Sequence, residues 1–183
     1  PFSRTDNGGK TQTVTARSGR APVTEQATRI ILKAEHLGTN AQEPSEGPIA
    51  NLIDGNTATF FHTAWSVAIP GPHWLQIRLP EALTEGHWKF WYAPRNNGRQ
   101  KPTDFDILVS TGGSDWTLVK KFTKDEDGLP VTATDAYTSP NLPVTQPFDH
   151  IRMVVNAVNS GEVFFTMSEF RLWHVKVVDP EAE

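Results

Sequence analysis

The 183-residue sequence contains no cysteine. This absence excludes a disulfide framework, a thiolate nucleophile and any zinc site with cysteine ligands. No apolar run approaches the ~18 residues that a membrane-spanning helix requires. The 17 basic residues are outnumbered by 21 acidic ones, which gives a formal net charge of −4. Non-specific nucleic-acid binding depends on concentrated Lys and Arg, so we expect no nucleic-acid partner.

Sequence signatures of catalysis are also missing. The chain has no H-E-x-x-H, G-x-S-x-G, P-loop or G-x-G-x-x-G pattern. An acid/base pair could be drawn from Asp104 and Asp106, but strand alternation places both on an exposed face. The acidic run 125–127 is interpreted as a solvated loop. We therefore predict that the chain is not an enzyme, and that it serves as an accessory module of a larger glycoside hydrolase or peptidase.

Alternating apolar and polar residues recur in short segments separated by clusters of Gly, Pro, Asn and Asp. No stretch keeps a 3.6-residue apolar stripe over three turns. This pattern favours an all-β sandwich. The expected strands begin near Arg29, Trp74, Trp88, Phe105, Trp116, Ile151 and Phe170.

The sequence predicts one main domain with a short segment on either side. Residues 1–28 are polar and are interpreted as an N-terminal extension or linker, with a peripheral strand at Thr13–Ala16. The domain spans 29–178, including a long polar stretch at 125–147 with one weak strand, and 179–183 form a C-terminal tail. Because the chain opens on Pro1 without a signal-peptide pattern, we expect it to be part of a longer protein. The lack of cysteine fits a secreted, periplasmic or surface-anchored bacterial protein.

The run Asn51–Trp65, N-L-I-D-G-N-T-A-T-F-F-H-T-A-W, collects a turn, oxygen ligands and aromatic residues. Hard cations such as calcium take six to eight oxygen ligands from a sharply turning loop. Asp54, Asn56 and Thr59 could supply them, with Glu169 completing the shell from a distant part of the chain. An EF-hand is excluded because its twelfth position would be a tryptophan. Taken alone, D-G-N is more often a simple Asx turn.

A second group of residues has the chemistry of a sugar site, which needs planar hydrogen-bonding groups and an aromatic face. His62 and Trp65 lie in the first loop, Arg95 and Asn97 in the loop A-P-R-N-N-G-R, and the pair Phe164–Phe165 in a late loop. Such loops cluster at one end of a sandwich. Each residue also has a structural interpretation: Asn97-Gly98 is a common turn dipeptide, and most tryptophans belong to the core.

Four motifs in order resemble the discoidin family, also called the coagulation factor 5/8 type C domain, which includes the family 32 carbohydrate-binding modules. They are D-G-N-T-A-T-F-F-H-T-A-W-S with G-P-H-W-L-Q-I-R-L, W-Y-A-P-R-N-N-G-R-Q-K-P-T-D-F-D-I-L-V-S, S-T-G-G-S-D-W-T-L-V and F-F-T-M-S-E-F-R-L-W. The resemblance covers about residues 29–178. It implies an eight-stranded jelly-roll β-sandwich with a structural calcium near one end.

The resemblance also implies which residues form the two sites. By motif position, the calcium ligands fall on Asp54, Asn56, Thr59 and Glu169. The sugar site falls on His62, Arg95, Asn97 and either Phe164 or Phe165. Two positions depart from the family pattern: Phe61 stands where a tryptophan is common, and the loop around Asn96 and Asn97 is shorter than in many sugar binders, which leaves these two asparagines as alternatives.

Three functions remain open from the sequence. The first is a module that binds a glycan of the galactose or N-acetylhexosamine type. The second is a protein–protein or adhesion module, with Phe164 and Phe165 as a hydrophobic anchor. The third, membrane-surface binding through Trp65 and the same phenylalanines, is disfavoured by the negative net charge.

Overall fold

The computed structural model describes residues 2–5, 11–14, 24–132 and 135–178. The chain divides into two compact units, the larger comprising Ala27–Lys176 and the smaller Pro1–Gln26 with Val177–Glu183. The domain expected from the sequence, 29–178, begins and ends within two residues of the larger unit. In the smaller unit, β1 (Phe2–Thr5) pairs antiparallel with β2 (Thr11–Val14).

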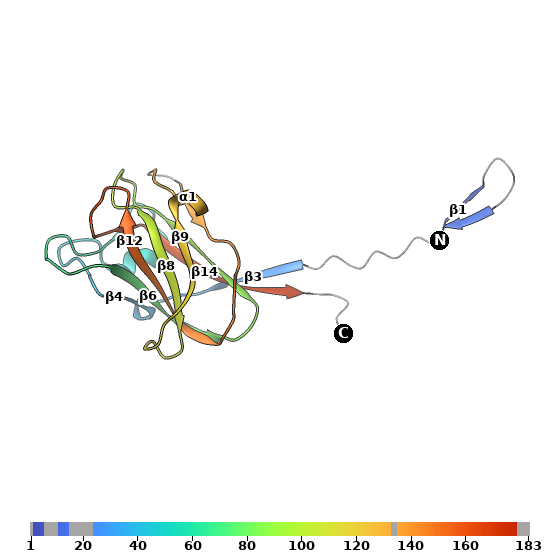
Figure 1. Cartoon of the computed structure of the whole chain (residues 1–183), viewed down its shortest axis with the longest axis horizontal. Coiled ribbons are helices and arrows are strands. Elements are labelled where there is room, and N and C mark those ends of the chain that lie inside the picture. The colour runs from blue at the N-terminus through green and yellow to red at the C-terminus, as the bar shows by residue number, and fades with distance from the viewer. Residues whose placement is uncertain (1, 6–10, 15–23, 133–134, 179–183) are drawn as a thin grey trace. The chain divides into compact units, whose positions relative to one another are not determined.

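The larger unit is a β-sandwich of two five-stranded sheets, which confirms the predicted fold class (Figure 1). The first sheet has the order β10-β7-β14-β3, with β11 also paired to β7, and the second has the order β4-β6-β12-β8-β9. The strands of the first sheet are β3 (Thr24–Ile30), β7 (His87–Ala93), β10 (Tyr137–Thr138), β11 (Leu142–Pro143) and β14 (Glu169–Val178). Those of the second are β4 (Leu37–Thr39), β6 (His73–Leu83), β8 (Pro102–Ser110), β9 (Thr117–Thr123) and β12 (Phe148–Val158).

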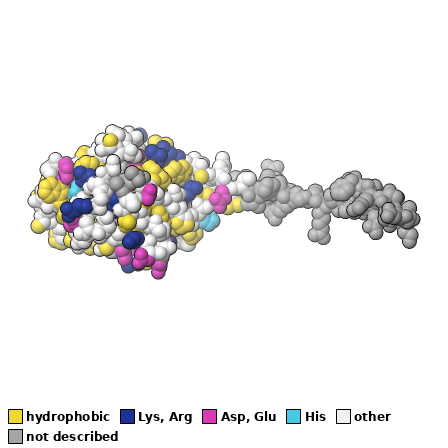
Figure 2. Space-filling view, turned by 90° about the horizontal axis from the view of Figure 1, so that it is seen from above, with side chains coloured by type: hydrophobic (Ala, Val, Ile, Leu, Met, Phe, Trp, Pro, Cys, Tyr) yellow, Lys and Arg dark blue, Asp and Glu magenta, His cyan; other side chains and the backbone are white. Residues whose placement is uncertain are grey.

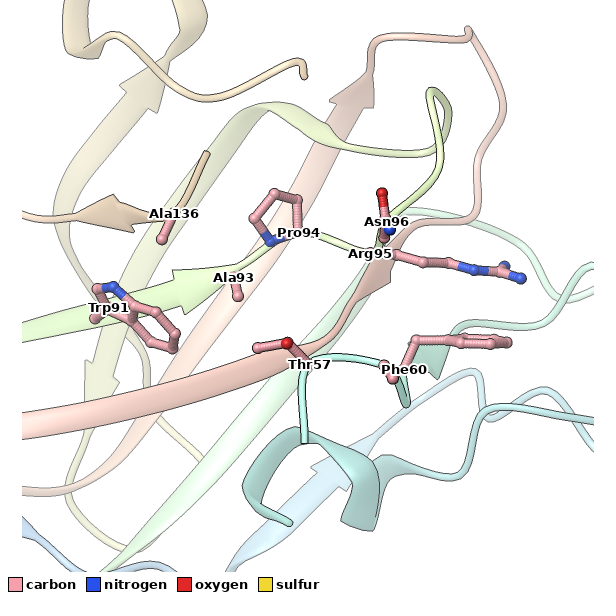
Figure 3. A pocket seen from close by; sticks show the side chains of 9 residues that line it. Thr57, Phe60, Trp91, Ala93, Pro94, Arg95, Asn96 and Ala136 are labelled. Atoms are coloured by element: carbon pink, nitrogen blue, oxygen red, sulfur yellow. The ribbon is translucent and has the colours of Figure 1, made fainter. Parts of the chain in front are cut away.

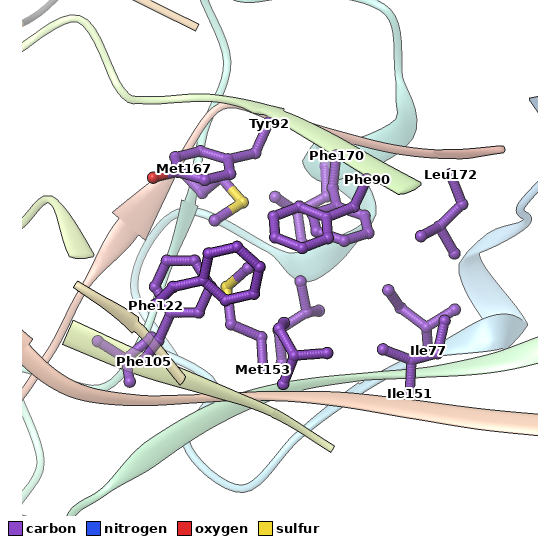
Figure 4. Close-up of a cluster of buried hydrophobic side chains, with 14 of the residues drawn as sticks. Ile77, Phe90, Tyr92, Phe105, Phe122, Ile151, Met153, Met167, Phe170 and Leu172 are labelled. Carbon is purple, nitrogen blue, oxygen red and sulfur yellow. The ribbon is translucent and has the colours of Figure 1, made fainter. Parts of the chain in front are cut away.

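The core lies between the sheets and is rich in aromatic rings (Figure 4). Strand β7 directs every second side chain inward, so Phe90 and Tyr92 are buried while Trp91 is partly exposed. The Phe90 ring stacks on Phe170 of β14 at 5.9 Å and meets Phe122 of β9 edge-on at 5.4 Å. Offset-stacked and edge-to-face pairs of this kind each add about 0.5–1.5 kcal/mol beyond the burial of their area.

Several elements differ from the sequence-based expectation. The acidic run 125–127 belongs to a one-turn helix, α1 (Lys124–Asp127), and not to an irregular loop. The Thr123 side chain caps its first turn by accepting a hydrogen bond from Glu126, and Gly128 ends it at φ 67°. The stretch 125–147 contains β10 and β11 in place of one weak strand. The first strand of the sandwich begins at Thr24, before the expected Arg29. The ten strands of the two sheets include three of only two or three residues, so a total of eight depends on how short strands are counted.

The loops of interest leave the sandwich at one end of β7. Ala93, the last residue of β7, pairs with Glu169, the first residue of β14. At this end β5 (Phe61–His62) pairs with β13 (Thr166–Met167) as a separate two-stranded sheet. The loop after β7, the turn before β5 and the loop before β13 are therefore brought together. Two 3₁₀ helices, Ala34–His36 and Ile49–Ile53, complete the regular structure of the described residues, in which no helix is long and apolar enough to cross a membrane.

Candidate functional site

His62 forms the floor of a cluster of aromatic rings. Its ring centroid lies 5.7 Å from that of Phe164 and 6.4 Å from those of Phe60 and Trp65. Its Nδ1 lies 2.6 Å from the carbonyl oxygen of Thr63, so Nδ1 carries the donated proton and Nε2 is left as an acceptor. Burial lowers the pKa of His62, which keeps the ring neutral at pH 7. The side chain is only 2% exposed, so a direct hydrogen bond from His62 to a sugar stays a prediction that requires the rings above it to move.

Trp65 is the most exposed ring of the cluster, and its backbone is held by a buried carboxylate. The Trp65 indole is 50% exposed and donates from Nε1 to Glu46 at 3.0 Å. Glu43, which is 2% exposed, accepts from the backbone N–H groups of Trp65 and Ser66 at 2.8 and 2.9 Å. Its other oxygen accepts from the Ser66 hydroxyl at 2.6 Å and from the N–H and hydroxyl of Ser45. Glu43 therefore fixes the loop that presents Trp65, a role that no local sequence pattern indicated.

Arg95 extends from the loop after β7 across an aromatic face. Its guanidinium carbon lies 3.5 Å from the ring centroid of Phe60, a cation–π contact. Beneath this loop the fully buried Lys101 donates from Nζ to the Arg95 carbonyl oxygen at 2.6 Å. Burial and then the nearby Arg95 charge lower the pKa of Lys101. Asn97 turns the loop back by donating its N–H to the same carbonyl at 2.7 Å.

A hollow of about 630 Å³ opens beside Arg95 (Figure 3). Phe60 and the guanidinium of Arg95 lie side by side at one end, and Trp91 lies at the other end. Asn96 lines this hollow and Asn97 does not. Which of the two asparagines binds a sugar stays a prediction. The remaining lining residues are Thr57, Ala58, Ala93, Pro94 and Ala136.

The two neighbouring phenylalanines of the late loop have different positions, which corrects one sequence prediction. Phe165 is fully buried and its ring meets Phe61 edge-on at 5.8 Å, so it belongs to the core and cannot stack on a ligand. Phe164 is partly exposed and faces His62. Because β13 begins directly after this pair and successive side chains point to opposite faces, only one of the two can face outward. Period-2 alternation alone could not choose between them.

The predicted metal ligands do converge on one turn. Glu169, 1% exposed, accepts from the N–H groups of Gly55 and Asn56 at 2.7 and 3.1 Å. Asp54 accepts from the Asn56 N–H at 2.8 Å and from the Thr59 hydroxyl at 2.6 Å. The same hydroxyl lies 2.7 Å from the Asn56 carbonyl oxygen. The single proton of this hydroxyl can be donated to only one of the two oxygens. The turn therefore contains more hydrogen-bond acceptors than donors.

The charges of this turn fit a bound cation. Burial raises the pKa of Glu169, and the neighbouring Asp54 raises it further. The Thr59 hydroxyl lowers the pKa of Asp54. The ion pair that Glu169 forms with Arg171 is long, at 3.7 Å. Among the residues that the structure describes, no three His, Cys, Asp or Glu side chains are grouped to hold a metal, so the other ligands would be hydroxyl and carbonyl oxygens, which suits calcium.

We expect Glu43→Gln to lower the melting temperature at pH 7, because a neutral amide cannot accept hydrogen bonds from all the donors that surround the carboxylate. Those hydrogen bonds hold the pKa of Glu43 well below its ordinary value. The stabilisation is therefore complete above the unfolded-state pKa of about 4.3 and fades as the pH falls further toward the folded-state pKa. Melting curves of both proteins are measured between pH 3 and 7, and the difference between their melting temperatures should narrow as the pH falls. A gap that does not narrow would contradict an electrostatic role for Glu43.

In an antiparallel sandwich, residues that bind ligands or catalyse reactions are commonly carried on the loops at one end, where the polar and aromatic side chains gather here. The model of the F5/8 type C domain matches residues 36–170. The chain belongs to this family, which confirms the resemblance in its sequence motifs.

Solved structures with the same fold include family 32 carbohydrate-binding modules. CpGH89CBM32-5 from Clostridium perfringens, in complex with GalNAc-β-1,3-galactose, superposes with a TM-score of 0.64 at 17% identity, covering 79% of this chain and 99% of that one. The family 32 module of C. perfringens NanJ, in complex with galactose, gives 0.58 at 22% identity, covering 81% and 100%.

Among curated proteins, a sialidase from Micromonospora viridifaciens is 27% identical over 176 residues, which is 92% of this chain and 24% of that protein. An A type blood N-acetyl-α-D-galactosamine deacetylase from Flavonifractor plautii is 30% identical over 89 residues, 42% of this chain and 11% of that protein. The chain thus spans a quarter or less of the length of these two relatives.

Proposed function

We propose that this domain is a non-catalytic carbohydrate-binding module that recognises a glycan of the galactose or N-acetylhexosamine type at the loop end of the sandwich. The observation that carries the proposal is the placement of Arg95 on Phe60, beside the rings of His62, Phe164 and Trp65. Sugars are bound by this combination because an aromatic face covers their C–H patch while planar donors bind their hydroxyls.

The side chains take different parts in the proposed site. Arg95 donates hydrogen bonds to sugar hydroxyls, and Asn96 or Asn97 adds an amide from the same loop. The exposed face of Trp65 and the edge of Phe164 cover the sugar ring, and Nε2 of His62 is the acceptor beneath them. A shallow site of this kind binds weakly, with Kd on the order of 0.1–1 mM, or about −4 to −5.5 kcal/mol.

A structural calcium ion at Asp54, Asn56, Thr59 and Glu169 forms part of the proposal. The ion would neutralise two adjacent carboxylates, one of them buried, and hold the turn that leads into Phe60. Calcium supplies charge and coordination there, while the ligands to sugar all come from the protein. The placement of the module in a secreted or surface-anchored bacterial protein is proposed on the same family relationship.

The glycan proposal is tested with an array and titration calorimetry. Arg95→Ala should weaken binding by roughly 10- to 150-fold, since a hydrogen bond to a charged group contributes about 1.5–3 kcal/mol. Arg78→Ala is the matched control, because Arg78 is exposed on β6 in the other sheet. Silence of the array and of calorimetry at millimolar galactose, N-acetylhexosamine and fucose would reject the proposal.

A protein partner is the alternative function. Its support comes from three exposed apolar residues, Trp65, Val67 and Val163, which are 50%, 46% and 54% exposed. They lie on the loops after β5 and before β13. Phe165 no longer supports it, because its side chain is in the core. Retention of a surface-protein partner by a Trp65→Ala/Val163→Ser variant would contradict this alternative.

A further inference from the structure

A second hollow lies on the outer face of the first sheet and shares a residue with the hollow beside Arg95. It measures about 380 Å³ and is lined by Ala27, Lys89, Trp91, Thr138, Arg171 and Trp173. Trp91 lines both hollows. The surface beside Arg95 therefore continues along β7 onto the sheet, away from the loops. We call the side chains of Lys89, Trp91, Arg171 and Trp173 the sheet platform.

The pairing of β7 with β14 determines which residues of the sheet platform are neighbours. Trp91 of β7 lies opposite Arg171 of β14, and Lys89 lies opposite Trp173. Aromatic and cationic residues therefore alternate in both directions, and the two tryptophans are diagonal neighbours, a relation in which the backbones typically lie about 7–8 Å apart. The residues between them, such as Phe90 and Leu172, point into the core and anchor both strands.

The contacts of the sheet platform hold it in place while leaving it accessible. The guanidinium carbon of Arg171 lies 4.4 Å from the Trp91 ring centroid, a cation–π contact that orients both side chains. Arg171 also lies 3.7 Å from Glu169, whose carboxylate is buried. All four platform side chains are partly exposed. A ligand can thus reach two aromatic rings and two cations without rearrangement of the sheet.

The charge of this surface differs from that of the protein as a whole. The residues lining the two hollows include Arg95, Lys89 and Arg171 and no Asp or Glu, although the chain carries a net charge of −4. On the face of the molecule shown in Figure 2, by contrast, charges of both signs are interspersed. An anionic ligand is therefore favoured here. A nucleic-acid strand is a poorer fit, because its non-specific binding depends on concentrated Lys and Arg, and the residues that line the two hollows supply only three of them.

We propose that the sheet platform binds an acidic polysaccharide, a chain of uronic acid residues that extends from the glycan site at the loops. Sugar rings lie on Trp91 and Trp173, and carboxylates pair with Arg171 and Lys89. The inference rests on the proposed glycan-binding function and adds a ligand class to it. A single sugar at the loop site would not use Lys89 or Trp173, so these two residues report on the platform alone.

The test is calorimetric titration of the whole chain with oligogalacturonates, and with the same chains after reduction of the carboxyl groups to alcohols. The acidic chain should bind at least tenfold more tightly than the reduced chain, and this difference should shrink with added NaCl. Lys89→Gln should remove most of the difference, whereas Trp173→Ala, which removes a stacking surface, should weaken binding of both chains. The same variants should leave binding of the neutral terminal glycan from the array unchanged.

The outcomes separate this inference from the proposed function. Binding of the neutral glycan without any preference for the acidic chain overturns the sheet platform and leaves the loop site standing. If binding of the acidic chain survives in Trp173→Ala and in Lys89→Gln but is lost in Arg95→Ala, the carboxylate contacts lie at the loops. That result also overturns the sheet platform. If single-stranded DNA of the same charge displaces the bound acidic chain as well as free acidic chain does, the assignment to a polysaccharide is overturned. Lys89→Gln keeps the aliphatic part of the side chain on the sheet. It therefore tests the sheet platform even if Trp173→Ala does not fold.

Discussion

Replacing Phe165 with alanine should lower the free energy of unfolding by about 3–5 kcal/mol, the usual cost of removing a buried phenylalanine from a core. The neighbouring change, Phe164→Ala, should cost less than about 1 kcal/mol, in keeping with a partly exposed ring, but should weaken glycan binding. The difference arises because Phe165 packs on Phe61 inside the sandwich, whereas Phe164 covers His62 at the surface. Denaturant unfolding measures the first effect and glycan titration the second.

The pair of variants is its own control, since both remove the same atoms from adjacent positions. The stability change of Phe165→Ala is a large fraction of the 5–15 kcal/mol typical of a folded domain. Phe165→Leu, which refills most of the cavity, should recover part of that loss and bind glycan normally. Equal stability losses in the two alanine variants would show that the burial difference between these residues is wrong.

Calcium should raise the melting temperature of the wild-type protein by about 5–10 °C when it is a hundredfold above its Kd. This follows from about 2.7 kcal/mol of linkage free energy and from a shift of about 2–4 °C per kcal/mol for a protein of this size. Asp54→Ala or Glu169→Gln should abolish the calcium-dependent shift, because each removes a carboxylate from the oxygen-rich turn. Differential scanning calorimetry with calcium and with EDTA measures it.

Glu81→Gln is the matched control, since it removes one negative charge from an exposed position of β6. It should retain the full calcium shift. Elemental analysis of the EDTA-treated protein distinguishes a trapped ion from an absent one. If metal-free wild-type protein melts at the same temperature with and without calcium, the proposed ion is not part of the fold.

The sequence was most informative where a local pattern determines structure. Alternation located the long strands, because a side chain that faces the core on one residue faces outward on the next. The strand around Trp74 is an example, with Leu75, Ile77 and Leu79 all buried. The ordered motifs identified the family and, with it, the sandwich.

Contacts between distant parts of the chain could not be read in the same way. Glu43 binds the backbone of Trp65 across 22 residues and lies in none of the family motifs. Lys101 lies within one of them, but nothing in that motif indicates that its side chain supports the carbonyl of Arg95 from the core. The choice between Phe164 and Phe165 depended on where β13 starts. The two-residue strands were missed because each is too short to show a period.

One turn serves both proposed sites. Thr57 and Ala58 line the hollow beside Arg95, while Asp54 and Thr59 on either side of them belong to the oxygen-rich turn. A cation that orders this turn would therefore change the free energy of glycan binding, and thermodynamic reciprocity requires the glycan to change the affinity for the cation by the same factor. Coupling of the usual 1–3 kcal/mol corresponds to about 5- to 150-fold. The calcium concentration needed to half-saturate the domain should then be lower on a glycan-covered surface than in free solution.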